Sequence, residues 1–473
     1  MSTRRKLMAN LTHLPVEIIE GIMDAAHPMP HGIIDSRHAE QRPAASTFGA
    51  LRLVCRELNA KVFKRYVETM FSVHTVILEE PSLRALIDMG ENEHFRNALS
   101  TLFIDIREIV HDLPSSAPEE DRSWLQNIID MRDPISVTTR LFQQVLPIFP
   151  NLREMTIEHT TVLGHCSASR MACLGASAVQ KRLGRRASLG EQALNNQHLF
   201  RALFMGLATM KKELIDLQIR FVCRGEYARI GSEYIEWDHL AHRTHEAYLT
   251  TDFLKSLLQH SDYEGFDATL QGLTTLALPI RVPPSRDFGD IYGAPEDWPG
   301  EFEPTVLANF ISLSPELQDL TVFFAAGDDQ AMIDIKAAIP WNSLSNLWAL
   351  ELGGTQFEYN ALVASLAVLK GTLRNLTLRH VKLNSKAEWI SLIRFLHTKM
   401  DLTDFEIWEP SSADVPGYKS GLCFRNLKGK CYQPYRAWRV KKQLPEDLDR
   451  YLADLKETKM HKIRAPGCQF AGW

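Results

Sequence analysis

A short apolar pattern recurs nine times between residues 73 and 407, with hydrophobic residues at its first, fourth and sixth positions. The alternation at the fourth and sixth positions predicts a β-strand with one buried face. Successive units start 26, 53, 62, 59, 44, 30, 26 and 29 residues apart, so the last four are nearly regular. The units begin at Val73, Leu99, Leu152, Leu214, Leu273, Leu317, Leu347, Leu373 and Leu402, and the first reads Val73, Val76, Leu78.

Helical patterns precede most of these predicted strands. Apolar residues at helical spacing lie ahead of Leu214, Leu373 and Leu402, with Gly371 placed to end the second of these helices and Ser385 placed to cap the third. Strand–loop–helix units in series give parallel strands with right-handed crossovers. We therefore expect an α/β fold in which the units stack as a solenoid with an extended concave surface. A set of separate small α/β domains is the alternative, because so loose a pattern also arises by chance.

The first seventy residues differ from this body and predict a small helical module. Leu14, Ile18 and Ile22 recur at four-residue steps behind Pro15, a residue that suits the first turn of a helix. After a polar, proline-containing stretch from 27 to 45, a second apolar stripe continues towards Met70; it comprises Phe48, Leu51, Cys55, Leu58 and Val62. Such a module buries little surface alone and gains stability from a partner. The alternative is a helical cap on the domain behind it.

Two runs in this module, Leu14-Pro15-Val-Glu17-Ile18-Ile19 and Leu51-Arg-Leu53-Val54-Cys55-Arg56-Glu-Leu58, resemble the F-box. The resemblance covers about 60 residues and is to F-box proteins of the fungal type. Their F-box commonly precedes an irregular leucine-rich-repeat-like array, whose units span about 20–29 residues. It implies that a Skp-type adaptor, linked to a cullin, binds the side chains of Leu14, Pro15, Ile18, Ile19 and Val54.

Long inserts follow several predicted strands, at 105–135, 158–192, 220–245 and 279–304. In a solenoid such inserts fall on the same edge, which is often the binding edge. The last insert is proline-rich and carries Asp290, Tyr292 and Trp298, side chains suited to recognition of a protein target. An irregular surface loop is the alternative interpretation.

Composition favours an intracellular protein whose main task is not nucleic-acid binding. The net charge of -5 argues against nucleic-acid binding as the main task. Seven scattered cysteines without a CxxC pair indicate reduced thiols, and hence a cytoplasmic or nuclear protein. The longest apolar run, 361–369, is about half of what a membrane-spanning helix needs, so we expect no membrane partner.

The sequence offers no catalytic motif and no metal or cofactor site. His239, His242 and His245 are spaced so that a helix would fan their rings apart, which does not suit metal ligation. His165, Cys166 and Cys173 lack a fourth ligand nearby. Nucleophile elbow, zinc protease, phosphate-loop and dinucleotide motifs are absent from the sequence.

Two basic stretches remain. Arg185-Arg186-Ala187-Ser188 has the form that basophilic kinases recognise, and phosphate at Ser188 would add about -1.5 to -2 charge. Residues 424–442, which we call the basic–aromatic segment, mix lysine and arginine with Phe424, Tyr432, Tyr435 and Trp438. This segment suits a polyanion; a solvated face packed on the last repeat is the alternative.

These observations predict three parts: an F-box-like helical module (1–72), a leucine-rich-repeat-like solenoid (73–420) and a C-terminal basic/aromatic segment with a capping helix (421–473). The expected function is substrate recognition in a Skp–cullin–F-box-type ubiquitin ligase, without catalytic residues. A repeat-type interaction scaffold with no ubiquitin role is the alternative, and an enzyme without a readable motif is a third possibility.

Overall fold

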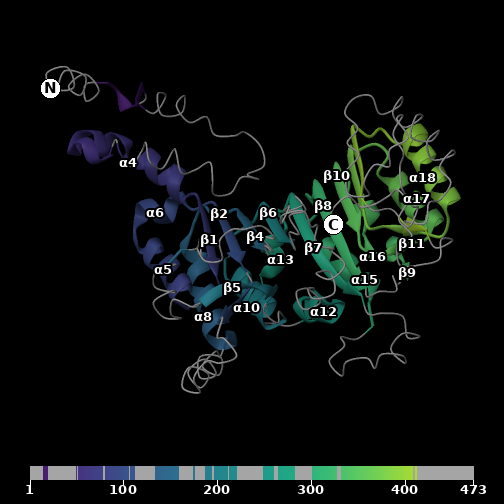
Figure 1. Cartoon of the computed structure of the whole chain (residues 1–473), viewed down its shortest axis with the longest axis horizontal. Coiled ribbons are helices and arrows are strands. Elements are labelled where there is room, and N and C mark those ends of the chain that lie inside the picture. The colour runs from purple at the N-terminus through teal and green to yellow at the C-terminus, as the bar shows by residue number, and fades with distance from the viewer. Residues whose placement is uncertain are drawn as a thin grey trace, which may run out of the picture.

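In the computed structural model, nine strands of the described residues form one parallel sheet whose spatial order is the order of the chain. Figure 1 shows them following one another along the longest axis, from β1 to β10 and beyond. They are β1 (Val73–Ile77), β2 (Thr101–Asp105), β4 (Glu154–Glu158), β6 (Asp216–Arg220), β7 (Thr275–Val282), β8 (Asp319–Ala326), β10 (Ala349–Gly353), β12 (Asn375–Arg379) and β14 (Asp404–Trp408). The residues described are 14–16, 18–19, 50, 52–77, 80–105, 107–111, 134–158, 174–175, 187–193, 197–210, 212–220, 249–259, 265–282, 301–326, 332–408 and 411–412.

The α/β class and the nine predicted strands are confirmed, and the strands share one sheet and one apolar core that runs from Val76 to Ile407. The alternative of separate small α/β domains is therefore wrong. In each unit after the first, the fourth and sixth pattern positions are the second and fourth residues of the strand. Parallel register places these residues side by side, so they form two continuous buried rows, as Leu350 and Leu376 do in one row and Leu352 and Leu378 in the other.

The first unit departs from the predicted register by two residues. Strand pairing aligns Val76 with Ile104 and His74 with Leu102, so the unit reads Phe71, His74, Val76. A histidine thus occupies a row that holds large apolar residues in the other strands. Its Nε2 atom is buried and has no hydrogen-bond partner among the described residues. Burial lowers the pKa of His74 from 6.5 to about 4, because the charged ring would lose its hydration.

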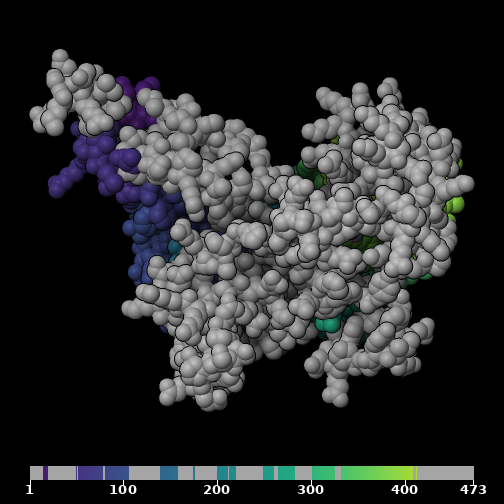
Figure 2. Space-filling model, viewed as in Figure 1, coloured from purple at the N-terminus to yellow at the C-terminus, as the bar shows by residue number. Residues whose placement is uncertain are grey.

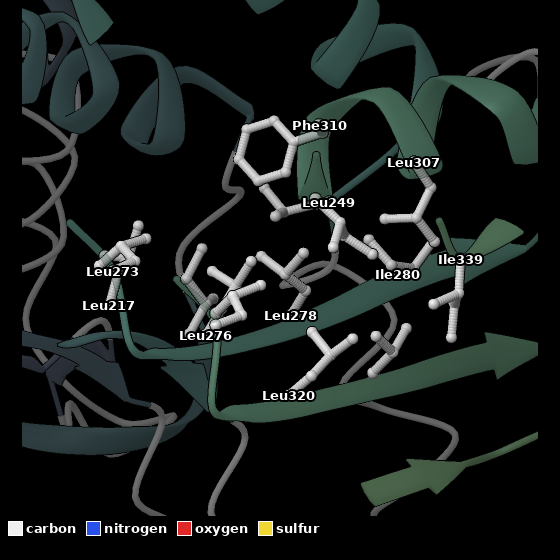
Figure 3. Close-up of a cluster of buried hydrophobic side chains, with 14 of the residues drawn as sticks. Leu217, Leu249, Leu273, Leu276, Leu278, Ile280, Leu307, Phe310, Leu320 and Ile339 are labelled. Atoms are coloured by element: carbon white, nitrogen blue, oxygen red, sulfur yellow. The ribbon is translucent and has the colours of Figure 1, made fainter. Parts of the chain in front are cut away.

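Helices cover the apolar face of the sheet and pack against one another in sequence. In Figure 3, Leu307 and Phe310 of α15 lie above Leu278 and Ile280 of β7 and Leu320 of β8. Side chains on this face are excluded from water, and burying each contributes about 1.5–3 kcal/mol relative to leaving it exposed. The helices are α5 (Glu80–Glu91), α6 (Glu93–Ala98), α8 (Pro134–Val145), α10 (Gln197–Ala208), α12 (Thr251–Gln259), α13 (Phe266–Leu270), α15 (Pro304–Ile311), α16 (Ile335–Ala338), α17 (Tyr359–Val368) and α18 (Lys386–Lys399).

The two predicted helix boundaries have different outcomes. Ser385 caps α18 as expected, because its hydroxyl accepts a hydrogen bond from the backbone N–H of Glu388 at 3.2 Å. Gly371 does not adopt the left-handed conformation typical of a helix end, and α17 already ends at Val368. Carbonyl oxygens in the last turn of α17 accept short-range backbone hydrogen bonds; the N–H of Leu369, for example, donates to the Leu366 carbonyl at 3.0 Å.

The residue immediately before each strand joins neighbouring units through its carbonyl oxygen. The carbonyl of Ser72 accepts the N–H groups of Ser100 and Thr101, both at 2.9 Å. The carbonyl of Arg374 accepts those of Thr403 and Asp404, at 2.7 and 3.1 Å. This double acceptor recurs at every junction of the described sheet, at Ser72, Ser100, Arg153, Ile215, Thr274, Gln318, Trp348 and Arg374.

The last four units, which the sequence showed to be nearly regular, share a second short strand. In each, the chain turns after the long strand and pairs again in parallel, and in the first three of these units a helix follows. The turn needs a left-handed residue, which is Gly354 (φ 79°) after β10 and His380 (φ 51°) after β12. These strands are β9 (Met332–Ile333), β11 (Gln356–Phe357), β13 (Lys382–Leu383) and β15 (Ser411–Ser412).

Two of the long inserts meet each other. The insert after β2 contains β3 (Arg107–His111), which pairs in antiparallel fashion with β5 (Ala187–Ala193) from the insert after β4. Leu174, also from the insert after β4, donates its backbone N–H to the Thr75 carbonyl at 2.8 Å, at the edge strand β1. These contacts place parts of both inserts in the same region, as the sequence predicted for inserts at equivalent positions.

Gly354→Ala should destabilise the protein by roughly 2 kcal/mol or more, because the new Cβ would lie 2.1 Å from the carbonyl oxygen of Phe324 at a positive φ. Gly371→Ala is the matched control: nothing lies within 4 Å of its Cβ position. We expect it to be neutral or to stabilise slightly, by less than about 1 kcal/mol. Chemical denaturation followed by circular dichroism measures both, and equal effects would contradict the assigned turn.

His74→Leu should remove part of the acid sensitivity of the fold. The folded pKa of about 4 lies below the unfolded value of 6.5, so between these values the unfolded chain binds a proton that the folded chain does not. Stability is therefore lost as pH falls through this window, by up to about 3 kcal/mol. Denaturation curves from pH 7 to 4 should show a shallower decline for His74→Leu than for the unmodified protein. His380→Asn, at an exposed turn, should keep the full decline.

Candidate protein-interaction surfaces

The N-terminal module has a small core of its own. Ile19 packs with Leu58 and Val62 of α4 (Arg56–Phe71), and all three are buried. The Lys61 ammonium donates a hydrogen bond to the carbonyl oxygen of Leu14 at 3.0 Å. The two segments that resemble the halves of an F-box are therefore in contact, although more than thirty residues separate them in the sequence.

The structure divides the predicted adaptor-binding residues into two groups. Ile19 is inside the module's core and Leu14 packs against it. Pro15, Ile18 and Val54 are exposed, Ile18 by 50% and Val54 by 38%. The exposed group is available to a partner, whereas the buried group holds the module together.

Leu53 is the most exposed large apolar side chain of the described residues, at 88%, and the sequence analysis did not single it out. It lies two residues from Leu51, so on a helix it falls away from the apolar stripe formed by Leu51, Cys55 and Leu58. A leucine that lies off the apolar stripe was the signal that could have identified this exposed residue.

Contacts around Arg52 fix the segment that carries Leu53 and Val54. The Arg52 guanidinium lies 4.1 Å from the ring centroid of Tyr66 and 5.1 Å from that of Phe63. Its Nε donates to Asn59 Oδ1 at 2.8 Å. The Cys55 thiol then caps α4 by accepting from the N–H of Leu58. Residues 52–54 are thus held against α4 rather than left as an independent tail.

Aromatic rings join the module to the sheet. The ring of Phe71, at the end of α4, stacks on that of Phe95 in α6 at 4.4 Å and meets that of His74 in β1 at 5.4 Å. Only Ser72 separates α4 from β1. α4 therefore also packs against the first unit of the sheet. Figure 2 shows its atoms at one end of the molecule, and in Figure 1 this end lies farthest from α18.

The face of the sheet opposite the helices carries polar rows. The first, third and fifth residues of each strand point to this face, since side chains alternate along a strand. In the C-terminal half, the strands β8 to β14 place Asp319, Glu351, Asp404 and Glu406 on it. Arg379 lies on the same face, and its guanidinium forms an ion pair with Glu351 at 2.6 Å.

Apolar side chains are exposed just before two of the strands. Ile215 is 45% exposed and Trp348 is 44% exposed, at the equivalent position before β6 and β10. The backbone carbonyls of Ile215 and Trp348 each accept two N–H groups from the next unit, so the backbone holds both residues firmly. An exposed tryptophan on a rigid backbone is typical of a protein-binding surface.

Several predicted residues cannot be placed. Asp290, Tyr292 and Trp298 lie outside the described residues, as do His239, His242 and His245, the His165–Cys173 group and the basic–aromatic segment. Ser188 lies in β5, where its backbone pairs with Val110 of β3. The capping helix expected after residue 421 also lies outside them.

Neither metal-binding nor membrane-spanning features occur in the part of the chain that the structure describes. No cluster of three or more His, Cys, Asp or Glu residues is arranged there to hold a metal ion. None of its helices is long and apolar enough to cross a bilayer.

Two basic groups with strongly lowered pKa values lie three strand positions apart rather than in one site. His74 lies in β1, and Lys212 precedes β6. Burial, with the nearby Arg153 charge, lowers the pKa of Lys212 to about 8. The Lys212 ammonium donates to the carbonyl oxygen of Phe149, which is a structural contact between units.

Comparison with models of known protein families and with curated protein sequences finds no match for this chain.

Proposed function

We propose that this protein is a substrate receptor of a Skp–cullin–F-box-type ubiquitin ligase. The observation that carries the proposal is a helical module with its own buried core that leaves Leu53, Val54 and Ile18 exposed. These side chains belong to, or adjoin, the residues that the F-box resemblance assigns to the adaptor. Burying a leucine that is exposed in the free protein contributes about 1.5–3 kcal/mol to a complex.

The body of the protein supports a binding role through its repetition. The order of the strands is the order of the chain, and the last four units each repeat a long strand and a short strand, followed by a helix in the first three of them. We interpret this architecture as an irregular leucine-rich-repeat-like solenoid. Such arrays present extended surfaces to protein partners, and here the polar sheet face is the surface that we propose binds the target.

The strand order also favours a non-catalytic role. In open α/β sheets, small molecules bind at the point where the strand order reverses. The described sheet runs from β1 to β14 without such a reversal. In our proposal, the protein acts by raising the effective concentration of a target near the ubiquitin-charged enzyme.

The ring contacts between α4, α6 and β1 explain how the module could hold a bound adaptor in a fixed orientation relative to the sheet. Rings on α4, α6 and β1 join the module to the first unit, and one residue separates α4 from the sheet. An adaptor bound to the module is thereby held in a fixed direction relative to a target bound on the sheet. A flexible linker would give a lower effective concentration, because it spreads the target over a larger volume.

Leu53→Asp combined with Val54→Asp should weaken binding of a purified Skp-type adaptor by at least tenfold, because two exposed apolar contacts become charged. Val368→Asp on α17 is the control, since the exposure of Val368, 50%, lies between those of Val54 (38%) and Leu53 (88%), but Val368 lies in another unit. Its affinity should equal that of the unmodified protein. Isothermal titration calorimetry or pull-down measures both.

Adaptor binding that survives both substitutions at Leu53 and Val54, in a protein that remains folded, would contradict the docking assignment. Leu14→Ala with Pro15→Ala is a second test, on the residues named by the resemblance. If the unmodified chain does not bind the adaptor but still captures a protein partner, the scaffold alternative is favoured.

A further inference from the structure

The exposed apolar pair of the N-terminal module lies at a break between two helical stretches. Residues 52–54 are helical, Cys55 is extended (φ -159°, ψ 163°), and α4 then begins at Arg56. The side chains of Leu53, Val54, Cys55 and Arg56 are all exposed. Because consecutive Cα atoms are about 3.8 Å apart, these four residues form one continuous patch of surface.

Two arginines flank the apolar pair, one on each side in the sequence. The Arg52 guanidinium lies over the rings of Tyr66 and Phe63 and donates to Asn59. These partners are neutral, so the positive charge of Arg52 is held in place without being offset. Arg56 is exposed, and neither arginine forms an ion pair with a carboxylate among the described residues.

The cations farther along α4 differ from these two arginines. Lys61 forms an ion pair with Glu57 at 3.7 Å, and Lys64 forms one with Glu68 at 3.8 Å. Both carboxylates of α4 therefore have cationic partners within the same helix. The positive charge that no carboxylate offsets lies at the start of α4, beside Leu53 and Val54, in a chain whose net charge is -5.

The position of Arg56 in α4 makes a structural role for its charge unfavourable. Arg56 is the first residue of this 16-residue helix. The peptide dipoles of a helix give its N-terminus a partial positive charge, so a cation there is repelled rather than stabilised. An exposed cation that opposes its own helix contributes nothing to the described fold, whereas an anionic partner would complement it.

We infer that the adaptor meets this surface with carboxylates placed around an apolar centre, and that Arg56 sets the rate and orientation of docking. The inference rests on the proposed function and names the chemistry of its partner. Charge complementarity selects an acidic protein face, because arginine binds carboxylates through paired, charge-assisted hydrogen bonds. Leu53 and Val54 supply the apolar area that such a partner would bury.

The two kinds of side chain divide the kinetics of binding between them. A charge at the edge of an interface acts mainly on the association rate and on its dependence on salt. Buried apolar contacts act mainly on the dissociation rate. We therefore expect Arg56 to influence how fast the adaptor binds, and Leu53 to influence how long it stays bound.

Arg56→Glu tests the inference. Stopped-flow measurements with a purified Skp-type adaptor at about 50 mM salt should show an association rate roughly tenfold lower than that of the unmodified chain. At about 0.5 M salt the two rates should converge, because the Debye length shortens. Arg394→Glu is the matched control: Arg394 is also exposed, and it lies in α18, at the opposite end of the molecule from α4 in Figure 1. Its association rate should equal that of the unmodified chain.

Stability measurements separate this effect from damage to the module. Arg56→Glu places a negative charge where the dipole of α4 favours one, so its unfolding temperature should be unchanged or slightly raised. Arg56→Lys keeps the charge and should keep most of the association rate. If Arg56→Glu does not fold, Arg56→Gln and the salt series on the unmodified chain provide the same test.

The outcomes distinguish this inference from the proposed function. An adaptor that binds the unmodified chain at a rate independent of salt, or binds Arg56→Glu equally fast, would overturn the acidic partner face and leave the receptor function standing. No adaptor binding by the unmodified chain would overturn both. Arg56-dependent binding to phosphatidylserine vesicles, with an unchanged adaptor rate, would assign the arginine to a membrane surface and would also overturn the inference.

Discussion

The carbonyl ladder that precedes the strands holds every unit of the sheet in the same register. Each of these carbonyls accepts two N–H groups from the next unit, from Ser72 at one end to Arg374 at the other. Hydroxyls reinforce some of the same junctions, as when Thr403 Oγ1 donates to the Arg374 carbonyl at 3.3 Å. A shift of one residue in any unit would exchange its buried and exposed faces. The separation into one apolar and one polar face therefore depends on this ladder.

The sequence predicted the strands well because the buried rows demand apolar residues at fixed positions in every unit. The exception has a physical cause: His74 occupies a position that is apolar in the other units, so the apolar pattern coincides with Val73 instead and predicts a unit shifted by two residues. The short strands of the second sheet were not predicted, because two residues such as Gln356 and Phe357 carry no periodicity. Residues in the long inserts do not belong to the buried rows, so no repeating apolar pattern predicts where in the fold they lie.

The candidate adaptor surface shows a different limit. An apolar pattern identifies which residues belong to a helix face, but it does not distinguish the core of a module from its docking surface. Ile19 and Ile18 are neighbours in the sequence, yet one is 4% exposed and the other 50%. Leu53 contributes nothing to the stripe and is the most exposed of the described apolar residues. Ile18 lies on the predicted stripe of Leu14, Ile18 and Ile22 and is nevertheless exposed, so membership of a stripe does not separate the core of this module from its surface.

Register also determines how charge accumulates on the outward face. Asp319 and Asp404 occupy the same row, and the neutral Ala349 and Asn375 lie between them. This spacing limits direct repulsion between neighbouring carboxylates, while their potentials still add over the surface. Arg379 lies on the same face and forms an ion pair with Glu351 of the neighbouring strand.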